Sequence, residues 1–115
     1  MCSSDLRKLD PTNFVVYVNI GSMCGKLSQE AKDPNEQKAL LRQSELAFRE
    51  ALYFNHDSGL AAFNLAKVLA FEASQNPSDS GKMKEAVFYF NKACQLEPEN
   101  PEYRRHLVAA QAQSN

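Results

Sequence analysis

Ser44-x-x-x-Phe48-x-x-Ala51-x-x-Phe54-x-His56 recurs later in the chain as Ala86-x-x-x-Phe90-x-x-Ala93-x-x-Leu96-x-Pro98. A second matched pair precedes these stretches: Tyr17-x-Asn19-Ile20-Gly21-x-x-Cys24 before the first, and Ala62-x-Asn64-Leu65-Ala66-x-x-Leu69 before the second. A period of tens of residues is typical of arrays in which each unit buries its apolar face against a neighbour. The sequence therefore predicts a helical repeat array, whose usual product is a binding surface.

Helix breakers separate the segments of this array. Clusters of Pro, Gly, Asn, Asp and Ser bound stretches in which apolar residues recur every three or four positions, as on one face of a helix. We expect no strand, and we expect helices at about 13–31, 35–54, 59–75, 80–96 and 101–113. Between the third and fourth helices, residues 76–81 have almost no apolar content and predict a mobile loop.

Residues suited to helix starts agree with this division. Asn13 can cap the first helix, Ser58 or Asp57 the third and Ser80 the fourth, because their side-chain oxygens can accept from free amides of the first turn. Two prolines, Pro34 and Pro101, suit first-turn positions, where the missing amide is not needed.

Composition and charge favour no particular partner. Thirteen Lys and Arg are interspersed with fourteen Asp and Glu, which argues against nucleic acid. The longest apolar stretch, residues 14–20, is far shorter than the ~20 residues of a membrane span. The first residues show no secretory signal, although a mature bacterial lipoprotein can begin Cys-Ser-Ser, as residues 2–4 do. The sequence therefore leaves the compartment open between cytoplasm and periplasm.

Signals for a metal, a cofactor or an active site are weak. The three cysteines, Cys2, Cys24 and Cys94, form no C-x-x-C and show no metal-ligand spacing with the two histidines. We expect the cysteines inside the helices to be small buried hydrophobes. The segment Ser80-Gly81-Lys82 ends like a phosphate loop but lacks the earlier Gly and the following Ser or Thr. We therefore expect no enzyme, no metal and no cofactor.

The repeated positions resemble the tetratricopeptide repeat. Its signature has an aromatic residue, Leu-Gly and a second aromatic residue on helix A, then Ala, an aromatic residue, Ala and Pro on helix B. The first unit has Tyr17, Ile20, Gly21, Cys24, Ser44, Phe48, Ala51 and His56 at these places, and the second has Ala62, Leu65, Ala66, Leu69, Ala86, Phe90, Ala93 and Pro98. The resemblance implies an all-α solenoid of helical hairpins, with about five antiparallel helices in a right-handed superhelical stack.

The chain departs from this pattern in its length. From Pro11 to His56 is 45 residues and from His56 to Pro98 is 42, against about 34 in the family. Good helix formers at 26–32 and 36–41 indicate that both helices of the first pair are extended. As one domain over residues 1–115, the chain would then comprise the end of a preceding repeat (1–12), two repeats (13–56 and 57–98) and a partial repeat or capping helix (99–115).

The resemblance also implies a binding site, because helix A lines the concave groove of tetratricopeptide proteins. The matching positions here are Val15, Val18, Asn19, Ser22, Lys26, Leu60, Phe63, Asn64, Lys67, Phe71 and, on the last helix, Arg105 with Glu102, His106 and Ala109. The Asn amides can bond the backbone of an extended peptide as both donor and acceptor. The two phenylalanines, Phe63 and Phe71, have two open roles, as groove contacts or as packing against a missing neighbour.

The family's chaperone-tail binders use a carboxylate clamp of Lys and Asn on the first helix A. Val18 and Ser22 stand at those places, and Arg104 and Arg105 fall near but not on the third-helix places. We therefore expect a protein or peptide partner other than an acidic chaperone C-terminus.

Two alternatives to a free-standing scaffold remain. The chain could be the soluble repeat tail of a larger bacterial envelope or polysaccharide-assembly protein, because it begins at the end of a repeat. It could also form a homo-oligomer, since uncapped solenoid ends tend to stack.

Overall fold

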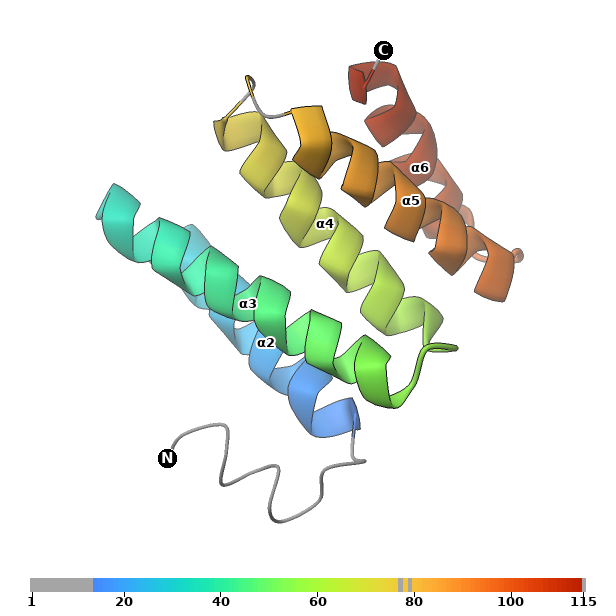
Figure 1. The fold of residues 1–115 in the computed structure, drawn as a ribbon, viewed down its shortest axis with the longest axis horizontal. Coiled ribbons are helices and arrows are strands. Elements are labelled where there is room, and N and C mark those ends of the chain that lie inside the picture. Colours follow the sequence, from blue (N-terminus) through green and yellow to red (C-terminus); the bar gives the residue numbers. More distant parts are fainter. Residues whose placement is uncertain (1–13, 77, 79, 115) are drawn as a thin grey trace. The chain divides into compact units, whose positions relative to one another are not determined.

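Helices form all the regular structure in the described part of the chain. The computed structural model describes residues 14–76, 78 and 80–114. Its helices are α2 (Phe14–Glu30), α3 (Pro34–Phe54), α4 (Gly59–Gln75), α5 (Ser80–Leu96) and α6 (Pro101–Ser114) (Figure 1). The all-α prediction is confirmed, and the expected helix ends agree within one residue. Expectations for residues 1–13, including the Asn13 cap and Cys2, lie outside the described residues, as do positions 77 and 79 of the predicted loop.

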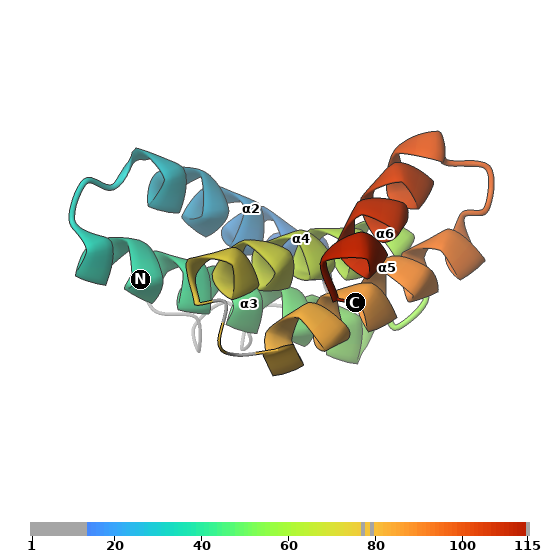
Figure 2. The ribbon, with the colours of Figure 1, turned by 90° about the horizontal axis from the view of Figure 1, so that it is seen from above.

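The chain divides into two compact units, Met1–Asp57 (unit 1) and Ser58–Asn115 (unit 2). In unit 1, α2 packs against α3, and the two helices run antiparallel (Figure 1). In unit 2, α5 packs against both α4 and α6, and a short turn joins α5 to α6 (Figure 2). None of the helices in the described ranges is both long enough and apolar enough to cross a membrane.

The core of unit 1 lies where α2 and α3 approach each other closely. A Cβ atom at Gly21 would lie 2.7 Å from the ring of Phe48, so a glycine is needed for α2 to reach α3 at this point. Beside it, the hydroxyl of Ser44 donates to the carbonyl oxygen of Gly21 at 2.7 Å in a buried hydrogen bond. Farther along, the ring of Tyr17 stacks on that of Phe54 with 5.6 Å between centroids. The small residues of the repeated pattern thus allow α2 and α3 to come into contact, and the aromatic residues of the pattern fill the space beside the small ones.

The two helices of unit 1 include most of the segments predicted from good helix formers. Residues 26–30 belong to α2 and residues 36–41 to α3, whereas residues 31 and 32 lie beyond the end of α2. Asp33 caps α3 by accepting from the amide of Asn35 at 3.1 Å, and Pro34 opens the helix as expected. The side-chain amide of Gln37 donates to the carbonyl oxygen of Ser28 at 3.2 Å, which ties the first turn of α3 to the last turns of α2.

Aromatic rings form the core of unit 2. The ring of Phe90 on α5 is 2% exposed and lies 5.8 Å from the ring of Phe63 on α4. From α6, the ring of Tyr103 stacks on Phe63 with 4.3 Å between centroids. At the places matching Gly21 and Ser44, unit 2 has Ala66 and Ala86, both fully buried. Small buried residues therefore occupy the same places in unit 2, where no hydroxyl matches that of Ser44.

The helix caps of unit 2 agree in part with the sequence. Ser58 caps α4 by accepting from the amide of Ala61 at 3.1 Å, as predicted. The predicted cap of α5 falls on Ser80, which is the first residue of the helix and whose side chain is outside the described set. At α6, Asn100 accepts from the amides of Glu102 at 3.0 Å and Tyr103 at 3.4 Å, next to the expected Pro101. The caps Asp33 and Asn100 were not predicted from the sequence.

We expect Ser58→Ala to lower the free energy of unfolding by about 1 kcal/mol, because the amide of Ala61 loses its side-chain acceptor at a buried helix end. Urea denaturation followed by circular dichroism measures this loss. Ser74→Ala is the control, because the exposed Ser74 hydroxyl bonds only the carbonyl of Phe71 within its own helix. Equal stability of Ser58→Ala and the wild type would contradict the capping role.

Candidate protein-interaction surface

One side of α2 carries four of the predicted groove residues. Val15, Asn19, Ser22 and Lys26 are all exposed and follow one another at steps of four, three and four residues. This spacing places them on one helical face. The opposite side of α2, with Tyr17 and Gly21, is buried. The predicted residues therefore form a polar stripe with Val15, 49% exposed, at one end.

The equivalent side of α4 has the same arrangement. Leu60, Asn64, Lys67 and Phe71 follow at the same steps of four, three and four residues. Leu60 and Lys67 are exposed, whereas Asn64 and Phe71 are half-buried. Asn64 thus has the same place on α4 as Asn19 has on α2.

Two of the predicted groove residues are buried. They are Val18 in unit 1 and Phe63 at the equivalent position of unit 2. Val18 is 6% exposed and Phe63 is 3% exposed. Tyr103 stacks on the Phe63 ring, and the ammonium group of Lys67 lies 4.9 Å from its centroid. Phe63 thus packs inside unit 2, against a neighbour that is present in the chain. These side chains support the faces of α2 and α4 from the inside.

The predicted residues on α6 differ in exposure. Glu102, Arg105 and Ala109 are exposed, and His106 is half-buried. The imidazole of His106 meets the Phe63 ring edge-on at 5.0 Å and lies 5.7 Å from the Phe90 ring. His106 therefore belongs mainly to the aromatic core of unit 2.

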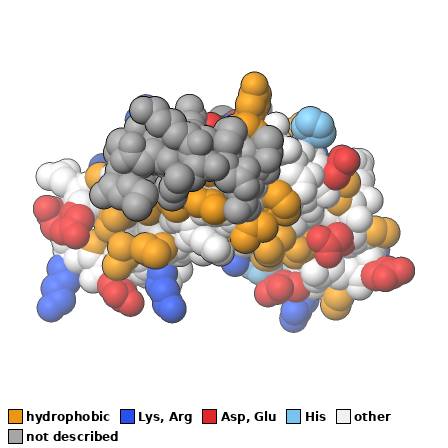
Figure 3. All heavy atoms as spheres, turned by 90° about the horizontal axis from the view of Figure 1, so that it is seen from below, with side chains coloured by type: hydrophobic (Ala, Val, Ile, Leu, Met, Phe, Trp, Pro, Cys, Tyr) orange, Lys and Arg blue, Asp and Glu red, His pale blue; other side chains and the backbone are white. Residues whose placement is uncertain are grey.

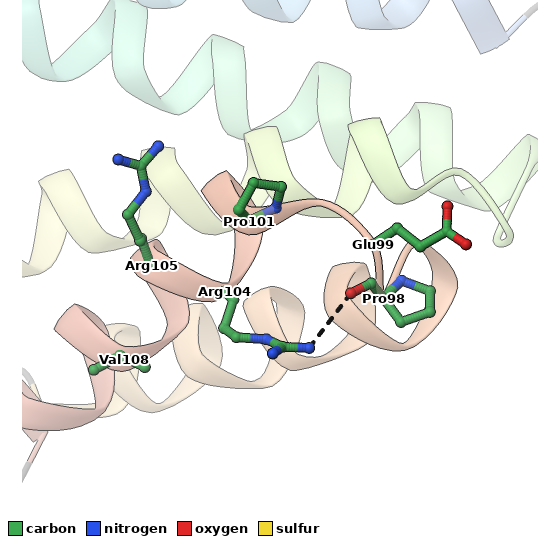
Figure 4. A pocket seen from close by; sticks show the side chains of 6 residues that line it. All are labelled: Pro98, Glu99, Pro101, Arg104, Arg105 and Val108. Atoms are coloured by element: carbon green, nitrogen blue, oxygen red, sulfur yellow. Dashed lines mark hydrogen bonds between the residues drawn. The ribbon is translucent and has the colours of Figure 1, made fainter.

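Arg105 instead lines an open hollow of about 490 Å³ at the start of α6. The hollow is lined by Pro98, Glu99, Pro101, Arg104, Arg105 and Val108 (Figure 4). This site was not predicted from the sequence. Part of its signal was present in the spacing of Pro101, Arg104, Arg105 and Val108, which places these four on one face of α6. The rest depends on the turn through Pro98 before the helix.

Glu97 links α6 to the start of α4. A Cβ atom at Gly59 would lie 2.5 Å from the carboxylate of Glu97, so the glycine leaves room for that side chain. Burial raises the pKa of Tyr103, and the charges of Glu97 and Glu102 and a hydrogen bond to Glu97 raise it further. The Tyr103 hydroxyl therefore stays protonated at neutral pH and can donate to Glu97.

Groups suited to metal binding are absent from the residues that the structure describes, which contain no cluster of three or more His, Cys, Asp and Glu side chains. Cys24 and Cys94 are half-buried free thiols. Burial raises the pKa of the Cys24 thiol, which keeps it in the less reactive neutral form. Both thiols lie on helices, at positions predicted to hold small hydrophobes.

Charges of both signs are mixed on the surface. In the view of Figure 3, Lys and Arg side chains stand among Asp and Glu side chains, with apolar side chains between them. Large exposed apolar side chains occur on every described helix, and include Met23, Leu46, Tyr53, Leu60, Phe88 and Val108. An exposed apolar side chain in a charged surrounding is common at protein interfaces, but singly it identifies no site.

No protein-family model matches the chain, and no curated protein is significantly similar to it.

Proposed function

We propose that the chain is a tetratricopeptide-like solenoid that acts as a non-enzymatic scaffold for a protein or peptide partner. The hairpins α2–α3 and α4–α5 would be its two repeats, stacked in a right-handed superhelix, with α6 as a further helix A or a cap. Its ligand surface would be formed by the outward sides of α2 and α4. The support comes from the repeated sequence positions and from the matched packing inside each unit.

The observation that carries this proposal is an Asn at the same place on the helix-A face of both units. On α2 and α4, successive steps of four and three residues bring an apolar residue, an Asn and a polar residue to one side. Asn19 is exposed and Asn64 is half-buried, and the next position differs, with Lys26 on α2 and Phe71 on α4. The opposite sides pack on helix B through small residues, Gly21 in unit 1 and Ala66 in unit 2. A structural repeat requires the inner sides to match, but it does not require an Asn on the outer sides. A shared ligand would explain why an Asn recurs on the outer sides of both helices.

The two Asn side chains suit an extended peptide. A primary amide offers a carbonyl acceptor and two N–H donors, and can therefore bond the N–H and C=O of one peptide residue at the same time. Val15 and Leu60, one turn earlier, would contact an apolar side chain of the ligand. Lys67, whose ammonium group lies on the Phe63 ring, would present a positive charge beside Asn64.

An affinity capture with matched variants tests this role. We expect Asn19→Ala/Asn64→Ala to lose at least about tenfold in affinity for a captured partner, because each lost pair of hydrogen bonds costs about 1 kcal/mol. The control Asn91→Ala/Gln95→Ala removes two exposed amides from α5 and should capture the partner like the wild type. Equal capture by wild type and Asn19→Ala/Asn64→Ala would contradict the proposal.

A further inference from the structure

The hollow at the start of α6 combines apolar walls with two cations. Pro98 lies in the turn before α6, Pro101 is the first residue of the helix, and Val108, 59% exposed, lies two turns farther along it. Arg104 and Arg105 extend on two sides of this apolar strip (Figure 4). The hollow measures about 490 Å³ and is an open depression, because all of its lining residues are exposed.

One of the two guanidinium groups is held in position by the turn. Arg104 donates from Nη2 to the carbonyl oxygen of Pro98 at 3.4 Å, which directs its side chain along the hollow (Figure 4). A guanidinium group has five N–H donors, so this bond leaves others for a ligand. Because the proline rings restrict the backbone around the turn, less conformational entropy is lost when a ligand binds there.

Within the described residues, no ion pair joins Arg104 or Arg105 to a carboxylate. Glu99 borders the hollow, but its carboxylate points away from both guanidinium groups (Figure 4). The hollow therefore complements a ligand with an apolar side chain and negative charges on both sides of it.

We propose that this hollow binds an acidic segment of a partner protein, in which a large apolar residue lies between glutamates or aspartates. The apolar side chain contacts Pro98, Pro101 and Val108. Flanking carboxylates bind Arg104 and Arg105, and guanidinium–carboxylate pairs can form two parallel hydrogen bonds each. This site goes beyond the proposed function, because it uses α6 and the turn before it and neither Asn19 nor Asn64.

Fluorescence anisotropy with a labelled peptide tests the proposal on the full chain. The probe is acetyl-Gly-Glu-Glu-Leu-Glu-Glu-Gly, and its counterparts have Gln for every Glu or Gly for Leu. We expect a Kd below about 1 mM for the probe and at least about tenfold weaker binding of each counterpart. Arg104→Gln/Arg105→Gln and Val108→Asp should each weaken probe binding about tenfold or more. Both variants change exposed side chains, and circular dichroism is used to check that they fold.

Two control variants distinguish binding in this hollow from general attraction of the probe to basic or polar side chains. Lys84→Gln removes an exposed cation from α5, and Asn19→Ala/Asn64→Ala removes the proposed groove amides; both should bind the probe like the wild type. Absence of binding at about 1 mM, or an equal loss in Lys84→Gln, would overturn the proposal.

Two further outcomes would also overturn it. If sedimentation showed a dimer for the wild type and a monomer for Arg104→Gln/Arg105→Gln, the occupant of the hollow would be a second copy of the chain. If only Asn19→Ala/Asn64→Ala lost the probe, the acidic peptide would bind the helix-A face. The proposed function would survive the second outcome, since it depends on those two amides.

Discussion

Phe90→Ala is expected to lower the free energy of unfolding by about 3–5 kcal/mol. The ring is 2% exposed and contacts Phe63 from α4 and His106 from α6, so its removal leaves a cavity where the three helices of unit 2 meet. Domains of this size have a total stability of only about 5–15 kcal/mol, so the variant should be partly unfolded at physiological temperature. Urea denaturation followed by circular dichroism measures the change.

Phe88→Ala is the matched control for this prediction. Phe88 lies on the same helix two residues earlier and is 61% exposed, so truncating it should change stability by less than about 0.5 kcal/mol. Similar losses in the two variants would mean that α5 does not pack through its Phe90 side.

Gly21→Ala is expected to destabilise unit 1 even though alanine is the better helix former. The new Cβ would lie 2.7 to 2.8 Å from three atoms of the Phe48 ring, which is itself buried and cannot move without opening the core. Overpacking of this kind costs about 1–3 kcal/mol, and the gain in helix propensity returns about 1 kcal/mol. Gly21→Val, which benefits less from that propensity, should lose more.

Gly25→Ala is the control on the same helix and should have the opposite sign. A Cβ there would meet only the Ser44 hydroxyl, at 3.4 Å, an ordinary contact. We therefore expect a gain of up to about 1 kcal/mol. Thermal and urea denaturation of both variants measure the difference. A gain in both would contradict the close approach of α2 and α3 at Gly21.

The helices could be predicted from sequence because their ends carry local signals. One such signal is Ser58 before a run of apolar residues, and two others are Pro34 and Pro101 at first-turn positions. Each acts within one turn of the chain, so no tertiary information is needed to recognise it. The caps Asp33 and Asn100 use the same chemistry. They were missed because each precedes a proline that already explained the helix start.

The candidate site could be predicted only in part, because exposure depends on what packs against a helix. The steps from Val15 to Lys26 and from Leu60 to Phe71 each follow one helical face, which is exposed on α2 and partly buried on α4. Phe63 is buried because Tyr103 of α6, far along the chain, stacks on it. Val18 lies three residues before Gly21 and so turns toward the buried side of its helix. The hollow on α6 required the path of the turn through Pro98, which spacing alone does not give.

Nuclear magnetic resonance tests most directly the proposal that the helix-A faces bind a partner peptide. A peptide selected for binding to the full chain is titrated into labelled protein, and the shifts of the backbone amides are followed residue by residue. We expect the largest shifts on α2 and α4, around Asn19, Ser22, Asn64 and Lys67, and their loss in Asn19→Ala/Asn64→Ala. Shifts confined to the outward sides of α3 and α5, around Leu46 and Phe88, would contradict the proposal.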